Sequence, residues 1–399
     1  MSDPAYAHFP TSEYLDRVRR ARDAMAARDL DALLVTGKEN VVYFSGLRTI
    51  SWISKHRAIV VLVPRDENQP VTSIIPENLY RVQEASSWVE KVVPWGGWRR
   101  KDAVPDPIEA IAKACREAGV AAGRIGIEIG EGHRIALTGE QLDELRRLIP
   151  DAKWVDGAQA LWDVRKIKSP AEAEVIRFAC AATDKAHAKA REAIRPGMTE
   201  RELAGIIMSE LVLETGEKPG FVMIRSGPDK YGMINCEAFE KPFEPGDIVV
   251  IDIGANYKDY WTDFMRMAVI GEPSADQKRL FEAEQASQQA GLDALAPGVP
   301  LGSVFDACFD TLIDMGMEEH VPGMERVGHG LGLDVHEPPS IARGSEAIAE
   351  PGMVLAIEPI FFDEPDQKIG NFALEDNVLV TEEGIEILSK TSKDLWIVE

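Results

Sequence analysis

The segment DIVVIDIGANYKDYWTDFMRMAVIG, residues 247–271, decides the fold of the second half of the chain. Two apolar strand patterns flank a turn at about Tyr257 and Lys258, so the segment predicts a β-hairpin. Pairing about that centre puts Asp252 directly opposite Asp263, and cross-strand neighbours project to one face with Cβ atoms about 5 Å apart. Two carboxylates among apolar neighbours repel each other unless a cation or a proton lies between them. The hairpin therefore predicts a site for positive charge.

Carboxylates in apolar strands recur further along the chain. MVLAIEPIFF contains Glu358, and FALEDNVLVT contains Glu375. His329 lies in the glycine-rich segment VGHGLGLDVHEPP, where glycine lets the backbone pass close to a site. Each residue alone has an ordinary interpretation as a turn, edge or hydrogen-bonded residue, but the five in this order favour a metal site. Four oxygen donors and one nitrogen suit two divalent ions, manganese, iron or cobalt more readily than a thiolate-seeking metal.

The composition favours a cytoplasmic enzyme or binding protein. The net charge of -23 argues against binding to nucleic acid or to an anionic membrane, because both attract positive patches. No apolar run approaches the roughly 18 residues of a membrane span, and the first residues contain no apolar stretch typical of a signal peptide. The four cysteines lack CxxC spacing, which fits reduced thiols.

Two domains are expected, because single cores usually stop growing at about 250–300 residues and the chain has 399. Strands alternating with helices predict an α/β domain over residues 1–160. A capping box at Ser169, with Glu172 three residues later, opens a long helix at the start of the second domain, residues 161–399. There a helix pair followed by antiparallel strands occurs twice, which predicts an α+β domain with an internal duplication.

The motifs DIGANYKDYWTD, GHGLGLDVHE, AIEP and LEDNVLVT resemble the metal-binding motifs of the pita-bread metallohydrolases, which include methionine aminopeptidase, prolidase, aminopeptidase P and creatinase. The resemblance covers nearly the whole chain, since the junction DVRKIKSPAEAEVIRFA is similar to the prolidase and creatinase branch. It implies a creatinase-like α/β domain, then a pita-bread catalytic domain with pseudo-twofold duplicated helix and strand units. It also implies a homodimer and two divalent metal ions (manganese, iron, cobalt or zinc). The implied ligands are Asp252, Asp263, His329, Glu358 and Glu375, with Asp263 and Glu375 bridging the ions.

The resemblance also implies catalytic roles. His336 would face the substrate, where it could donate a hydrogen bond to the oxygen on which negative charge develops. Its alternative role is that of a strand-end histidine contacting nearby backbone. A metal-bridged water would become a hydroxide nucleophile, and Glu358 beside it would transfer the proton.

The chain departs from the family pattern at one substrate-facing position. Related enzymes carry a histidine shortly before the first aspartate strand, but no histidine lies between His187 and His320. The expected position falls near Ile234 or Asn235, and an asparagine can donate a hydrogen bond but cannot act as a general acid or base. Substrate contacts are instead expected in the segment before that strand, where the planar fork of an arginine could bind a carboxylate and ordinary loop packing is the alternative. The residues singled out there are Arg225, Tyr231, Met233, Asn235 and Cys236.

The sequence therefore predicts a metal-dependent hydrolase that cleaves an amide-type C–N bond, similar to an Xaa-Pro dipeptidase or aminopeptidase, with a dipeptide or small-molecule substrate. The alternative on the same fold is a small-molecule hydrolase or lyase similar to creatinase, ectoine hydrolase or the dimethylsulfoniopropionate lyase, because of the missing histidine. A non-catalytic binding module is the least favoured prediction, since such relatives lose metal ligands and all five are intact here.

Overall fold

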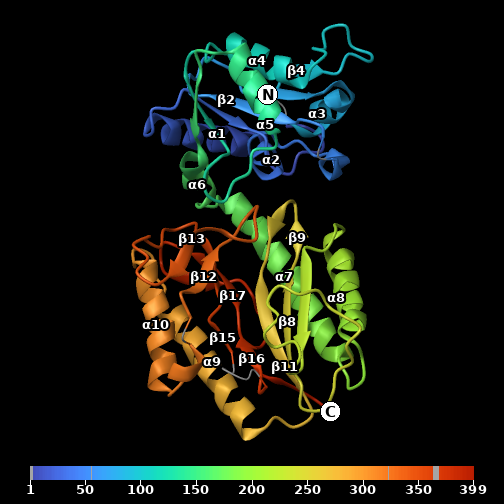
Figure 1. The fold of residues 1–399 in the computed structure, drawn as a ribbon, viewed down its shortest axis with the longest axis vertical. Coiled ribbons are helices and arrows are strands. Elements are labelled where there is room, and N and C mark those ends of the chain that lie inside the picture. The colour runs from blue at the N-terminus through green and yellow to red at the C-terminus, as the bar shows by residue number, and fades with distance from the viewer. Residues whose placement is uncertain (1–2, 55, 322, 363–367) are drawn as a thin grey trace. The chain divides into compact units, whose positions relative to one another are not determined.

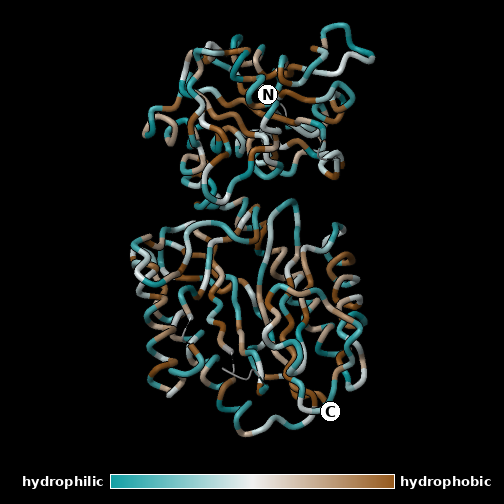
Figure 2. The backbone as a smooth tube through the Cα atoms, in the orientation of Figure 1, coloured by the Kyte–Doolittle hydropathy of each residue, from teal (hydrophilic) through white to brown (hydrophobic). Residues whose placement is uncertain are grey.

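A computed structural model describes residues 3–54, 56–321, 323–362 and 368–399 (Figure 1). The chain forms two compact units, Met1–Arg165 and Lys166–Glu399. We propose that these units are the two domains expected from the sequence. Figure 2 shows that hydrophobic residues gather along the central strands of each unit. In the part of the chain that the structure describes, no helix combines the length and apolar character needed to cross a membrane.

The N-terminal unit is a six-stranded mixed sheet with the strand order β4-β3-β2-β1-β5-β6, flanked by helices. Its core includes Leu34, Leu62 and Ile125 from the strands and Ile111 from a helix. The strands are β1 (Ala32–Val35), β2 (Val60–Pro64), β3 (Thr72–Pro76), β4 (Lys91–Trp95), β5 (Arg124–Ile127) and β6 (Lys153–Asp156). The helices are α1 (Thr11–Ala26), α2 (Lys38–Ser45), α3 (Tyr80–Ser86), α4 (Pro107–Glu117), α5 (Gly139–Leu148) and α6 (Ala158–Arg165), with short 3-10 turns at Ile50–Ile53 and Glu77–Leu79.

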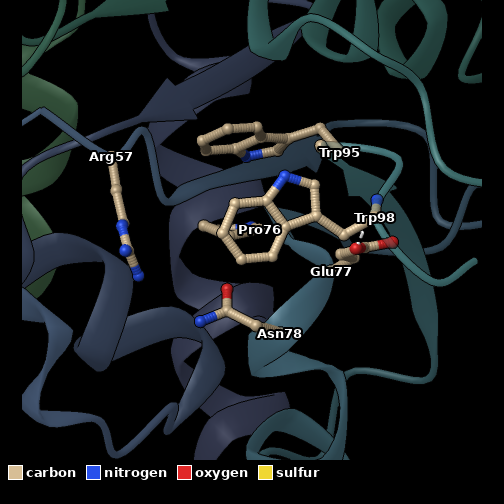
Figure 3. Close-up of a pocket in the computed structure, with 7 residues that line it drawn as sticks. Arg57, Pro76, Glu77, Asn78, Trp95 and Trp98 are labelled. Atoms are coloured by element: carbon tan, nitrogen blue, oxygen red, sulfur yellow. Dashed lines mark hydrogen bonds between the residues drawn. The ribbon is translucent and has the colours of Figure 1, made fainter.

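A loop after β4 borders a cavity in this unit (Figure 3). The Glu77 carboxylate accepts hydrogen bonds from the backbone N–H groups of Trp98, Arg99 and Arg100, at 2.5, 2.8 and 2.9 Å. Figure 3 shows Glu77 beside Trp98, with Arg57 across the cavity from them. The carboxylate thus fixes the loop, since its oxygens are used by three main-chain donors.

The C-terminal unit contains two larger sheets, each covered by a pair of helices. In Figure 1, α7 and α8 lie on one side of the sheets and α9 and α10 on the other. The helices are α7 (Pro170–Ala193), α8 (Glu200–Thr215), α9 (Ala275–Ala294) and α10 (Leu301–Asp314), with a 3-10 turn at Glu318–His320. Helix α7 begins with the predicted capping box at Ser169, and α8 and α9 begin with capping boxes at Thr199 and Ser274.

The first sheet has the order β19-β11-β8-β7, and the second has the order β13-β12-β14-β17-β18. Buried residues of α7 and α8 pack on the first sheet, and those of α9 and α10 pack mainly against the second. The strands of the first sheet are β7 (Phe221–Ser226), β8 (Ile248–Gly254), β11 (Phe264–Ile270) and β19 (Trp396–Val398). Those of the second are β12 (Arg326–Gly330), β13 (Glu337–Ala342), β14 (Val354–Ile357), β17 (Asp376–Val380) and β18 (Ile385–Ile387). Two short pairs complete the unit: β9 (Asn256–Tyr257) with β10 (Tyr260–Trp261), and β15 (Ile360–Phe362) with β16 (Asn371–Ala373).

The register of the β8–β11 hairpin differs from the prediction. Asp252 pairs with Met265, so the expectation that it lies directly opposite Asp263 is wrong. The turn is centred on Lys258 and Asp259, which both have positive φ angles of 51° and 69°, one residue later than predicted. Moving a hairpin centre by one residue changes each partner by two, and a shift of two keeps a side chain on the same face of the sheet. Both aspartates therefore still point to one side.

Candidate metal centre and substrate cavity

Five side chains predicted as metal ligands come together in the C-terminal unit. Asp252 lies in β8, Asp263 directly precedes β11, and His329 lies in β12. Glu358 directly follows β14, and Glu375 directly precedes β17. All five are buried. Ligand atoms within 4.8 Å of one another form three groups: Asp252, Asp263 and Glu375; His329, Glu358 and Glu375; and Asp263, His329 and His336. The two sheets thus contribute to a single cluster of potential metal ligands.

The His329 ring is oriented with one nitrogen toward the carboxylates. Its Nδ1 lies 2.9 Å from the Gly330 carbonyl oxygen, which can only accept, so Nδ1 carries the proton. Burial lowers the pKa of His329 to about 4, so the ring is neutral at neutral pH and Nε2 keeps a free lone pair. Nε2 lies 3.3 Å from Glu358 Oε1, 3.7 Å from Asp263 Oδ2 and 3.9 Å from Glu375 Oε1. A neutral imidazole in this orientation is a suitable metal ligand.

The carboxyl groups are strongly destabilised in their charged form. Burial raises the pKa of Asp252 to about 7, against the attraction of Arg225. Burial, together with the neighbouring carboxylates, raises the pKa of Asp263 and of Glu375 well above their usual range. Burial also raises the pKa of Glu358, while Arg326 opposes the shift. Four carboxyl groups this close together need bound protons or cations.

Several ligand atoms of the cluster have no hydrogen-bond partner. Oδ1 of Asp252, both carboxyl oxygens of Glu375 and Nε2 of His329 are enclosed and unpartnered among the described residues. Leaving a buried polar atom unpaired costs about 1–3 kcal/mol, and more for a charged group. Coordination of divalent cations would satisfy all of these atoms, so the donor set fits a metal centre.

A cavity of about 560 Å³ opens onto this cluster. Asp252, Asp263 and Glu358 form one part of its wall, and His336 forms another. The ring centroid of His336 lies 4.3 Å from that of His329. Partial burial lowers the pKa of His336 to about 4, so its ring is neutral at neutral pH. His336 therefore lies beside the potential ligands and offers a neutral N–H group to a bound molecule.

The loop that carries His336 is fixed by a buried ion pair. Lys168 Nζ lies 3.0 Å from Glu337 Oε2, and both side chains are almost fully enclosed. The other oxygen of Glu337 accepts the backbone N–H groups of Leu333 and Asp334, at 3.0 and 3.2 Å. On the opposite hairpin, the indole N–H of Trp261 donates to the Leu333 carbonyl oxygen at 3.0 Å. These contacts hold the His336 loop against the cluster.

The residues predicted for substrate binding are distributed unevenly. Arg225, Asn235 and Cys236 line the cavity, and Asn235 has a positive φ of 60°. Tyr231 lies in the hydrophobic core, and its hydroxyl oxygen accepts the Ile248 N–H at 2.9 Å. Met233 is exposed and does not belong to the described residues that line the cavity.

Sequence reasoning missed several residues of the cavity wall, among them Trp261 and Arg326, which carry polar groups. Trp261 precedes Asp263 by two positions, so strand alternation could have placed both on one face. Arg326 donates from Nη2 to Glu358 Oε1 at 3.1 Å. No local pattern marks this arginine, because its partner comes from another strand.

Comparison with known proteins gives the family. Residues 174–382 match the model of metallopeptidase family M24, and residues 17–167 match that of the creatinase/prolidase N-terminal domain. The chain therefore belongs to metallopeptidase family M24. This confirms the expected fold, a creatinase-like domain followed by a pita-bread domain, and the expected class of enzyme.

Individual relatives agree with this assignment. The chain is 28% identical to the Xaa-Pro dipeptidase of Pyrococcus horikoshii over 95% of its own length and 98% of the relative. It is 35% identical to the probable dipeptidase PepE of Mycobacterium tuberculosis over 59% of its own length and 61% of the relative. Among solved structures, dipeptidase PepE of Mycobacterium ulcerans superposes with a TM-score of 0.82 at 29% identity, covering 98% of this chain and 99% of the other. These relatives favour a metal-dependent peptidase over the small-molecule hydrolase or lyase.

Proposed function

We propose that this chain hydrolyses Xaa-Pro or similar dipeptides at a centre of two divalent metal ions. The observation that carries the proposal is the convergence of four buried carboxyl groups and the unpartnered His329 Nε2 in one cluster, of which Asp252, Asp263 and Glu358 line a cavity. The names of the relatives, several of which are Xaa-Pro dipeptidases, support the choice of substrate.

The ligands in this proposal are the five predicted residues. Asp263 and Glu375 would be the central ligands, because each shares ligand-atom groups with both Asp252 and His329. Together with Asp252, His329 and Glu358 they would hold the ions. The absence of cysteine from the cluster favours manganese, iron, cobalt or zinc held by oxygen and nitrogen.

The reaction would use two side chains beside the ligands. When bound, divalent ions would supply a hydroxide nucleophile near neutral pH and would polarise the scissile carbonyl. Glu358 would take the proton that the nucleophile loses and deliver it to the leaving nitrogen. The neutral His336 ring would donate a hydrogen bond to the carbonyl oxygen as negative charge develops there. Asn235 would contact the substrate where related enzymes carry a histidine, as a hydrogen-bond donor only.

We further infer that the protein acts in the cytoplasm as a homodimer on small substrates, without nucleic acid or membrane partners. The four free cysteines support a reducing compartment, and the net charge of -23 opposes binding to polyanions. Size-exclusion chromatography with light scattering measures the oligomeric state.

The first test is the metal content per chain, measured by mass spectrometry on protein purified without chelators or a metal column. We expect about two equivalents of divalent metal in the wild type, and loss of metal together with Xaa-Pro hydrolysis in Asp263→Ala. Asp310→Ala, an aspartate of α10 outside the cluster, is the matched control and should retain both properties. Folded wild-type protein that binds no metal, even with excess metal present, would contradict the proposal.

A further inference from the structure

Arg225 is an arginine in an unusual environment. It lies in β7 on the face that carries Met223, which pairs with Asp252 across the sheet. Its side chain is 1% exposed, whereas arginine is seldom fully buried unless it is paired. It also lines the cavity beside the potential metal ligands. Such a residue needs a partner.

The other fully enclosed large arginines of the described chain do have partners. Arg17 donates to the Tyr43 carbonyl oxygen and to Glu13, and Arg266 donates to Asp376 and to main-chain oxygens. The side chain of Arg225 makes no hydrogen bond to any described residue, and its Nε and Nη2 are enclosed and unpartnered. Arg225 is thus an unsatisfied cation at the cavity wall.

The charges around Arg225 change when the ligands are occupied. Asp252, Cys236 and Glu358 are its electrostatic neighbours, and the two carboxyl groups belong to the predicted ligand set. Two divalent ions would cancel the four carboxylate charges, after which these groups no longer neutralise Arg225. The other arginine of the wall, Arg326, keeps its hydrogen bond to Glu358 and is 45% exposed, so water can solvate it. With the ions bound, these carboxyl groups would no longer supply a counter-charge to the enclosed Arg225 guanidinium.

We propose that Arg225 binds the free carboxylate of the substrate, so that the site takes dipeptides and excludes longer or amidated peptides. The inference rests on the proposed function, and it separates a dipeptidase from an aminopeptidase, which the sequence left open. A guanidinium donates charge-assisted N–H hydrogen bonds to a carboxylate and keeps its charge at any working pH. A carboxylate blocked as an amide, or extended by a further residue, offers no negative charge at this point.

The test compares kcat/KM for an Xaa-Pro dipeptide and for its C-terminal amide, in metal-loaded protein. We expect the wild type to prefer the free carboxylate by at least about tenfold, equivalent to about 1.4 kcal/mol, mainly through KM. Arg225→Gln should remove the preference by losing activity on the dipeptide alone, and Arg225→Lys should restore part of it. Arg81→Gln removes an exposed arginine charge and should leave the preference unchanged. Equal activity of the wild type on both substrates would overturn the proposal without use of any variant.

A binding measurement separates this inference from the proposed function. Metal-loaded protein is titrated with N-acetylproline, which carries a carboxylate and no free amine, in a calorimeter. Binding by the wild type and by Arg81→Gln, with at least tenfold weaker binding by Arg225→Gln of equal metal content, supports the carboxylate site even if no peptide is cleaved. Equal binding by Arg225→Gln would mean that the carboxylate binds elsewhere, such as directly to metal, and would refute the assignment.

Discussion

His336 shows how a single residue acquires its role from its surroundings. Burial, and then the adjacent His329, keep its pKa at about 4, so at neutral pH it can donate a hydrogen bond but carries no positive charge. We expect His336→Ala to lower kcat on an Xaa-Pro dipeptide by roughly 10²-fold or more, as for loss of one oxyanion donor. Metal content should stay at the wild-type value, because His336 lies outside the five proposed ligands. Steady-state kinetics and mass spectrometry check both, and an unchanged kcat would exclude the role.

For single residues of the site, the sequence predicted those with a telling chemical type. It missed those whose role depends on a contact with a distant part of the chain. The five predicted ligands could be recognised because charged groups in apolar strands are costly. They are Asp252, Asp263, His329, Glu358 and Glu375. The role of Arg326 at the site could not be predicted, because Glu358, whose oxygen it contacts, lies 32 positions away in the chain. Tyr231 was expected at the substrate but lies in the core, because its hydroxyl is satisfied by the Ile248 N–H.

Among the elements, β12 needs small residues where it passes between its neighbours. A Cβ atom at Gly328 would lie 2.2 Å from the Ala356 carbonyl oxygen of β14, which is main chain and cannot rotate away. We expect Gly328→Ala to lower the free energy of unfolding by about 1–3 kcal/mol and to displace the adjacent His329, so that metal binding weakens. Urea denaturation and metal content are the measurements.

The matched control for this element is Gly205→Ala in α8, where a Cβ atom would meet nothing within 4 Å. Alanine favours the helix over glycine by about 1 kcal/mol, so this variant should be at least as stable as the wild type. Equal stability of Gly328→Ala and Gly205→Ala would contradict the close packing of β12 against β14.

The hairpin shows where element-level prediction stops. The strands β8 and β11 follow from their apolar patterns, but the centre of the turn lacks the Asn-Gly or Gly-Gly signal that usually marks it. Lys258 and Asp259 adopt the left-handed conformation instead, and only pairing of the strands reveals this. The predicted register was therefore wrong by two residues, although the face of each aspartate was unaffected.

For the whole molecule, His187 couples stability to pH. It is buried in α7, its Nε2 donates to the Phe264 carbonyl oxygen at 3.1 Å, and its Nδ1 has no partner among the described residues. Burial lowers its pKa to about 3, from a usual value of 6.5. Between these values the unfolded chain binds more protons, so this contribution to stability is complete above pH 6.5 and is lost as pH falls toward 3.

We expect the stability difference between the wild type and His187→Gln to shrink as the pH falls from 6.5, by up to about 1.4 kcal/mol per pH unit. Urea denaturation of both proteins at several pH values measures this difference, in which contributions from the other titrating groups cancel. A difference that does not change with pH would mean that His187 titrates alike in the folded and unfolded chain.

The sequence by itself determined the residue types of the metal centre, the capped helices that frame it and the faces to which Asp252 and Asp263 point. It could do so because strand alternation, capping and the cost of buried charge act over short stretches of chain. The tertiary structure decided the hairpin register, the contact between Arg326 and Glu358 and the unsatisfied state of Arg225. These depend on which distant segments meet, and a local pattern carries no information about a partner that is brought close only by folding.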